Sequence, residues 1–83
     1  MKNVTVIANI KKDPTLEVTK KTALILSKYA DTVYMDKSLI YDAPSCVSFV
    51  ESDLLFENTD AVITIGGDGN KEYLVAFTYK GKE

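Results

Sequence analysis

Residues 61–70 read AVITIGGDGN. The first half of this stretch is an apolar run rich in β-branched side chains, which is typical of a buried strand. Three of the chain's four glycines follow within residues 66–69. A strand that ends in a glycine-rich turn can bring backbone N–H groups and an acidic side chain, here Asp68, close to a phosphate or hydroxyl group of a ligand. The stretch therefore predicts a strand followed by a ligand-binding loop.

The residues before this stretch predict a strand, a helix and a second strand. The run VTVIA at residues 4–8 predicts the first strand, and TVYM at residues 32–35 predicts the second. Between them, Asp13 is expected to act as the N-cap of an amphipathic helix of about four turns, with Pro14 at its first position. The apolar stripe of this helix is expected to contain Val18, Thr22, Ile25 and Tyr29, widened by Leu26 and Ala30.

The remaining segments carry weaker signals. Turn residues dominate the first part of residues 36–60, which predicts a loop there. Ser45 is then expected to cap a short helix that reaches Leu54. After the glycine-rich loop, residues 71–79 are expected to form a further helix that uses Leu74, Val75 and Phe77 as its apolar contacts.

Strands that alternate with helices along the chain predict the α/β class. The expected architecture is a three-layer-type open parallel sheet with flanking helices, in a single domain spanning residues 1–83. Ligands of such sheets bind beyond the carboxyl ends of the strands. The loops at residues 9–12 and 66–70 are therefore expected to lie on one edge of the sheet and to form the site.

Composition excludes several classes of function. The net charge is −2, and all ten basic residues are lysines, so no basic field for nucleic acid is expected. The chain has no histidine and a single cysteine, Cys46, which excludes an internal disulfide and the usual zinc ligand sets. No metal-ligating residues are predicted. No apolar run reaches the ~20 residues of a membrane span, so a cytoplasmic protein without a membrane partner is expected.

Two familiar glycine motifs do not fit residues 66–71. The dinucleotide fingerprint requires a glycine where this chain has Glu72, and the P-loop requires a Gly-Lys-[Ser/Thr] triplet that is absent. The pattern Gly-Gly-Asp-Gly-[Thr/Asn/Ser] after an apolar strand instead resembles the nucleotide-handling loop of NAD kinases, diacylglycerol-type lipid kinases and phosphofructokinases. Residues 53–70, together with the opening strand, lysine-bearing loop and long helix, most resemble an ATP/polyphosphate-NAD kinase.

This resemblance implies phosphoryl transfer from ATP or polyphosphate to the 2′-hydroxyl of NAD, which gives NADP. Asp68 is implied as the catalytic residue that accepts or orients the hydroxyl proton. The nucleotides, with Mg²⁺ or another divalent metal accompanying ATP, are implied to bind at Gly66, Gly67, Asp68, Gly69 and Asn70. A helix beginning after Asn70 would offer its positive dipole end to anionic groups.

The family also has a second, mainly β domain, which is absent from these 83 residues. The chain is therefore expected to be a truncated N-terminal domain with little or no activity alone, and a homo-oligomer is expected for the longer enzyme. Two departures from the family pattern are Asn70, where threonine is commoner, and Lys71-Glu72, where apolar residues usually follow.

Alternative interpretations remain open at the level of the sequence. A lipid kinase shares the loop but usually carries an Asn-Glu pair soon after it. A non-catalytic α/β module would use the glycines only for a tight turn, with Asp68 capping the next helix. Lys11 and Lys12 fit a solvated loop better than phosphate ligands. Tyr34 and Tyr41 could stack on an adenine ring, but they fit packing roles equally.

Overall fold

The computed structural model describes residues 2–57, 59–67 and 73–79, and for residues 66, 67 and 73–79 the description is of the backbone. The elements, in chain order, are β1 (Asn3–Ile7), α1 (Glu17–Leu26), β2 (Thr32–Asp36), the 3-10 turn η1 (Lys37–Leu39), β3 (Val47–Val50), the 3-10 turn η2 (Ser52–Leu54), β4 (Ala61–Gly67) and β5 (Tyr73–Tyr79).

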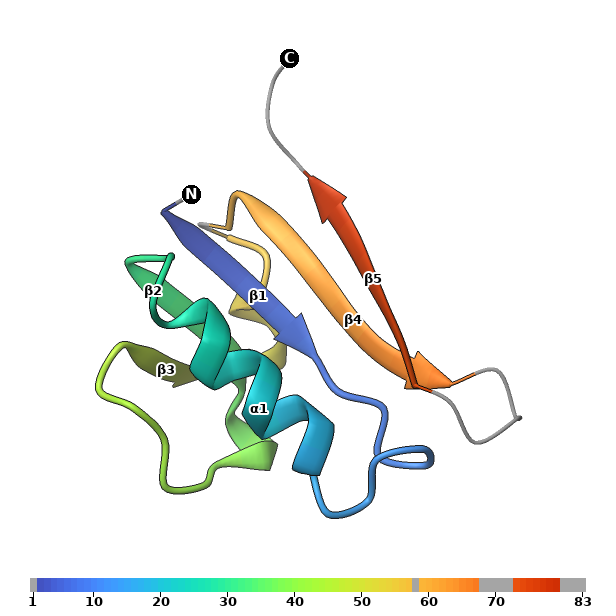
Figure 1. The fold of residues 1–83 in the computed structure, drawn as a ribbon. Coiled ribbons are helices and arrows are strands. Elements are labelled where there is room, and N and C mark those ends of the chain that lie inside the picture. The colour runs from blue at the N-terminus through green and yellow to red at the C-terminus, as the bar shows by residue number, and fades with distance from the viewer. Residues whose placement is uncertain (1, 58, 68–72, 80–83) are drawn as a thin grey trace.

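The described strands form one sheet in the order β3-β2-β1-β4-β5 (Figure 1). The strands β3, β2, β1 and β4 run parallel to one another, and β5 runs antiparallel to β4. In the β1–β4 pair, Val4 lies opposite Ala61 and Ile7 lies opposite Thr64. The predicted α/β class and open parallel sheet are therefore confirmed for β3, β2, β1 and β4, and β5 adds an antiparallel strand that was not predicted.

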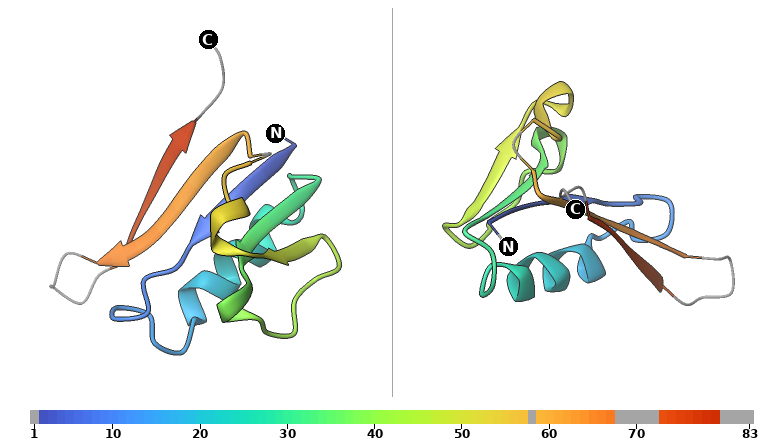
Figure 2. Two further views of the ribbon diagram at one scale, coloured as in Figure 1. Left: turned by 180° about the vertical axis from the view of Figure 1, so that it is seen from behind. Right: turned by 90° about the horizontal axis from the view of Figure 1, so that it is seen from above.

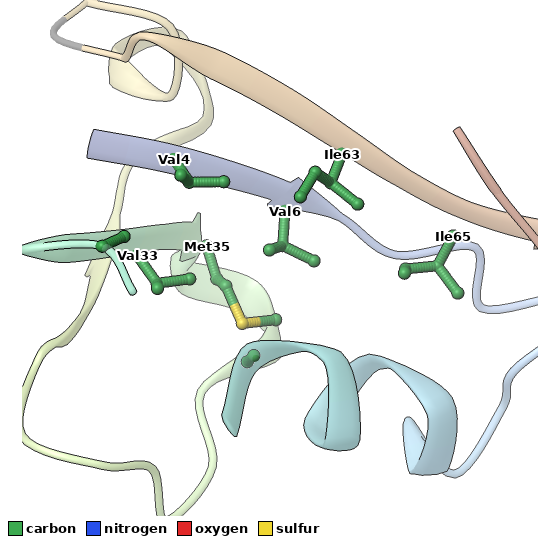
Figure 3. Close-up of a cluster of buried hydrophobic side chains, with 8 residues drawn as sticks. Val4, Val6, Val33, Met35, Ile63 and Ile65 are labelled. Atoms are coloured by element: carbon green, nitrogen blue, oxygen red, sulfur yellow. The ribbon is translucent and has the colours of Figure 1, made fainter. Parts of the chain in front are cut away.

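The two faces of the sheet are covered by different elements. The helix α1 lies along one face, and the connection from β3 to β4 crosses the opposite face (Figure 2). On that opposite face, the buried hydroxyl of Thr5 donates a hydrogen bond of 2.6 Å to the carbonyl of Leu55. The apolar core lies between α1 and the sheet (Figure 3), and its buried members are Val4, Val6, Ala23, Ala30, Val33, Met35, Ile63 and Ile65.

The face that α1 presents to the sheet differs from the predicted stripe. Ile25 and Tyr29 were expected inside, but they are 57% and 74% exposed. Thr19 and Ala23 are the fully buried residues of the helix, with Val18 and Leu26 packed beside them. Small side chains at the contact let the helix approach the sheet closely, so the larger Ile25 and Tyr29 are turned toward solvent.

The start of α1 also differs from the prediction. The helix begins at Glu17, and the residue in the N-cap position is Leu16, which adopts the left-handed conformation with φ of 61°. This backbone costs roughly 1–2 kcal/mol for a residue other than glycine. Asp13 nevertheless serves the first turn, because its carboxylate accepts hydrogen bonds from the amides of Val18 (3.2 Å) and Thr19 (2.8 Å). Asp13 was correctly identified as a capping side chain, but the prediction that it is the N-cap residue itself was wrong.

The carboxylate of Asp13 is 1% exposed and also accepts a 2.7 Å hydrogen bond from the Thr19 hydroxyl. Burial alone raises the pKa of Asp13, but the hydrogen bonds from Thr19, Val18 and Glu17 outweigh burial and leave the pKa below its ordinary value of 3.8. Because the folded-state pKa is depressed, the ionised carboxylate stabilises the fold above pH 3.8, and this contribution is lost as the pH falls through the folded-state pKa.

We expect Asp13→Asn to be less stable than the wild type at pH 7 and the difference between them to shrink below pH 3.8. The asparagine side chain does not titrate, so the loss of stability at low pH that is assigned to Asp13 does not occur in the variant. Urea unfolding at a series of pH values from neutrality downward measures both free energies. A difference that stays constant across this range contradicts the assignment.

The second half of the chain corrects two predicted helices. The helix expected from Ser45 to Leu54 is instead the strand β3 followed by η2. The helix expected over residues 71–79 is instead the strand β5 from Tyr73 to Tyr79. Both segments, VSFV and YLVAFTY, are rich in β-branched and aromatic residues, which pack well on a pleated sheet. In the second segment Tyr73, Val75, Phe77 and Tyr79 also alternate with the period of a strand.

Candidate functional site

The carboxyl ends of the parallel strands meet at one edge of the sheet. Because β1 is parallel to both β2 and β4, the chain leaves all three strands toward the same side. The ends of β1 and β4 point the same way in Figure 1. The loop that begins at Ala8 and the end of β4 at Gly66 and Gly67 therefore lie toward the same edge.

The first two glycines of the motif belong to the strand and not to a turn. Gly66 lies opposite Leu74 and Gly67 lies opposite Tyr73 in the antiparallel β4–β5 ladder. The register of β4 with β1 ends at the pair of Thr64 with Ile7. Because successive strand amides point to opposite sides, β4 beyond Thr64 directs alternate N–H groups toward the side of β1. The prediction that the glycine-rich turn begins at Gly66 was wrong, because Gly66 and Gly67 belong to β4.

The other predicted residues of the motif, Asp68, Gly69 and Asn70, lie outside the described residues. Their assigned roles stay predictions. The helix that was expected to begin after Asn70, and to offer its dipole to anionic groups, is not found over residues 73–79, which form the strand β5. Residues 73–79 therefore supply no helix N-terminus for anionic groups beside β4.

The loop after β1 is a compact turn organised by Asn9. The carbonyl of Asn9 accepts hydrogen bonds from the amides of Lys12 (3.1 Å) and Asp13 (2.7 Å). The Asn9 side chain accepts another from the amide of Lys11 (3.1 Å). Lys11 and Lys12 are exposed, and among the described residues no ion pair involves either of them. Their interpretation as solvated lysines agrees with this geometry.

A cleft of about 200 Å³ opens at the same edge, beside the ends of β1 and β2. Six of its lining residues are apolar, one is the hydroxyl residue Ser38, and one is the carboxylate Asp36; the apolar residues are Val6, Ile7, Ala8, Ile10, Leu39 and Leu55. Sequence reasoning missed this cleft. A signal that could have found it is Asp36 itself, an acidic residue directly after the apolar run of β2.

Asp36 is held by its own turn. Its Oδ1 accepts a 2.9 Å hydrogen bond from the amide of Ser38, which caps η1. The neighbouring Lys37 pairs with Glu51 at 3.0 Å, and both side chains are more than half exposed. This exposed ion pair contributes little to stability, at most about 1 kcal/mol. It joins the chain after β2 to the chain after β3.

Tyr41, one of the two tyrosines considered for adenine stacking, is engaged in packing contacts. The ring of Tyr41 lies edge-on to Phe49, with centroids 5.3 Å apart, and the ammonium of Lys20 lies 5.3 Å from its centroid. Its hydroxyl donates to the sulfur of Met35 at 3.5 Å. Burial raises the pKa of Tyr41 above 10.0. Tyr41 therefore links β2, β3 and α1 and leaves no free ring face for a ligand on the side of Lys20.

Cys46 is half-buried, and its Sγ lies 3.6 Å from the carbonyl oxygen of Ser27, which fits an inert packing role. Among the described residues, no group of three or more Cys, Asp or Glu side chains could hold a metal ion.

Comparison with protein-family models, with curated proteins and with solved structures gives no match. Within the described ranges, no helix combines the length and the apolar character that crossing a bilayer requires. The glycine motif and the geometry of the edge described above are therefore the features that bear on function.

Proposed function

We propose that this chain is the N-terminal nucleotide-handling domain of an NAD kinase, which transfers a phosphoryl group from ATP or polyphosphate to the 2′-hydroxyl of NAD. The observation that carries the proposal is the position of the motif. It begins at the carboxyl end of β4, a central strand that lies beside β1 in a parallel arrangement. Open α/β sheets bind their ligands at this edge.

The geometry of β4 favours contact with a phosphorylated ligand. The register of β4 with β1 ends at Thr64, and beyond it β4 directs alternate amides toward the side of β1, where a ligand at this edge would meet them. Glycine at positions 66, 67 and 69 removes side chains that would block the approach. Backbone amides can then face phosphate oxygens without requiring arginine, which the chain lacks.

In the proposed reaction Asp68 accepts the proton of the ribose 2′-hydroxyl. The hydroxyl oxygen forms a bond to the terminal phosphorus of ATP, and the bond from that phosphorus to its bridging oxygen breaks to release ADP. Asn70 donates a hydrogen bond to the anionic groups. Phosphoryl transfer depends mainly on positioning and on charge stabilisation, so a site without histidine can support it. By the same resemblance, turnover belongs to a protein that also has the second domain.

Calorimetric titration with NAD and with Mg-ATP tests this proposal. It is carried out on the 83-residue chain and on a longer protein that carries the same residues 61–70. We expect the longer protein to bind both nucleotides and the chain alone to bind them more weakly. Nicotinamide mononucleotide, which lacks adenosine, is the matched control ligand. If the longer protein binds neither NAD nor Mg-ATP, the proposal is contradicted.

The hairpin of β4 and β5 favours a second candidate, a non-catalytic α/β module. Two of the motif glycines sit at the end of a paired strand, where the approach to a hairpin turn alone can account for them. Such a module has no requirement for the Asp68 carboxylate in nucleotide chemistry. The absence of nucleotide binding in the titration above, with an intact fold, is the result that selects this candidate.

A further inference from the structure

We propose that the cleft at the ends of β1 and β2 holds the nucleoside part of the phosphoryl donor, with Asp36 accepting hydrogen bonds from its ribose hydroxyls. This inference rests on the proposed function and adds the class of donor to it. It predicts a nucleoside triphosphate donor in preference to inorganic polyphosphate.

The lining of the cleft suits a nucleoside. Its walls are apolar apart from Asp36 and Ser38, so a flat base can be placed against side chains such as Ile10 and Leu39. Ligand sites commonly combine an apolar lining with a few polar groups that fix the orientation. At about 200 Å³ the cleft is below the roughly 300–1,000 Å³ of sites for larger ligands, so it suits one nucleoside and not a whole dinucleotide.

Asp36 is placed to bind hydroxyl groups. The amide of Ser38 fixes Oδ1, and no partner of Oδ2 is found among the described residues. A half-buried carboxylate with one oxygen tethered can accept hydrogen bonds from neighbouring hydroxyls without losing much conformational freedom.

The distance between Asp36 and the end of β4 indicates that the ribose at Asp36 belongs to the phosphoryl donor and not to the NAD that accepts the phosphoryl group. The strand β1 lies between β2 and β4, and two strand spacings amount to roughly 10 Å. In addition, Gly67 lies three residues beyond Thr64, the partner of Ile7, which adds roughly 10 Å along the strand. The two neighbouring hydroxyls of one ribose cannot reach both Asp36 and the end of β4 across this distance. An extended triphosphate can cover much of it, with its ribose at Asp36 and its terminal phosphate toward the glycine motif.

The test compares ligands that share the phosphates but differ in the nucleoside. Mg-ATP, its 2′,3′-dideoxy analogue and inorganic tripolyphosphate are titrated into the 83-residue chain by calorimetry. We expect ATP to bind about 10- to 100-fold more tightly than the other two, because hydrogen bonds to a charged group are lost with the hydroxyls. Equal affinity for ATP and tripolyphosphate contradicts the inference. That result is still compatible with the proposed function, as an NAD kinase that uses polyphosphate.

Two variants locate the effect. Asp36→Asn is expected to lower the affinity for ATP by the same factor and to leave that for tripolyphosphate unchanged. The control is Asp31→Asn, an exposed carboxylate that precedes β2 at the opposite edge, and it should change neither affinity. A loss of NAD affinity without a loss of ATP affinity in Asp36→Asn places the acceptor in the cleft and contradicts the inference. If the wild-type chain binds none of ATP, tripolyphosphate and NAD, the inference is contradicted, and the titration of the longer protein decides the proposed function separately.

Discussion

Asp13→Ala is expected to lower the free energy of unfolding by about 3 kcal/mol or more. The substitution removes a buried carboxylate and leaves the amides of Val18 and Thr19 and the Thr19 hydroxyl without their acceptor. A buried polar group that loses its partner costs about 1–3 kcal/mol, and more when its partner was charged. A domain of 83 residues has a total stability of roughly 4–12 kcal/mol. The loss is therefore a large fraction of the whole.

Urea unfolding monitored by circular dichroism measures this loss. Asp31→Ala is a matched control, because Asp31 is exposed and no side-chain hydrogen bond of it is found among the described residues. Its unfolding free energy is expected to stay within about 0.5 kcal/mol of the wild type. Thr19→Val adds a further check, since it retains the shape of the side chain but removes the hydroxyl. If Asp13→Ala unfolds at the same urea concentration as Asp31→Ala, the carboxylate does not hold the start of α1.

Asp68→Asn is expected to reduce NADP formation by at least about 1,000-fold in a longer protein that carries residues 61–70. General-base catalysis contributes on the order of 10²–10⁴ in rate, and the same carboxylate is also proposed to orient the hydroxyl. An amide keeps the size of the side chain but cannot accept the proton at neutral pH. The thermal unfolding midpoint is expected to remain within a few degrees of the wild type.

Enzymatic detection of NADP, with saturating NAD and ATP, measures this effect. Asp53→Asn is the matched control, because Asp53 is an exposed residue of η2. It should leave the rate unchanged. Turnover in Asp68→Asn that equals that of Asp53→Asn refutes the catalytic role. A variant that loses turnover together with its cooperative thermal transition indicates a role for Asp68 in folding instead.

Three strands of the sheet were predictable because each contains a short β-branched run bounded by polar or turn residues. β1, β2 and the first part of β4 have this form, and their parallel pairing follows from the helix between the first two. β3 and β5 were not predicted, although both contain strand-forming residues. Their segments also fit a helical spacing over a few residues, and only pairing with β2 and with β4 decides between the two conformations.

The candidate site was predictable in part. The edge at which the motif begins followed from the order of strands and loops, because parallel strands end on the same side. Asp36 after the apolar run of β2 could have pointed to this edge, but the cleft itself was not predictable, because its lining comes from positions as distant in sequence as Val6 and Leu55. The helix face was missed for a similar reason. The spacing of Ile25 and Tyr29 fits an apolar stripe, but close packing against the sheet selects the smaller Thr19 and Ala23.

The sequence by itself determined local properties: the β-branched strands, the carboxylate at position 13 that serves a helix start, and the glycines that leave the end of β4 uncovered. Local sterics and hydrogen bonding are encoded over a few neighbouring residues, so they can be recognised in the chain. Only the tertiary structure decided that β4 is followed by an antiparallel partner and that Asp36 lies in an apolar cleft. Both depend on contacts between segments far apart in the sequence, whose free energies no local pattern contains.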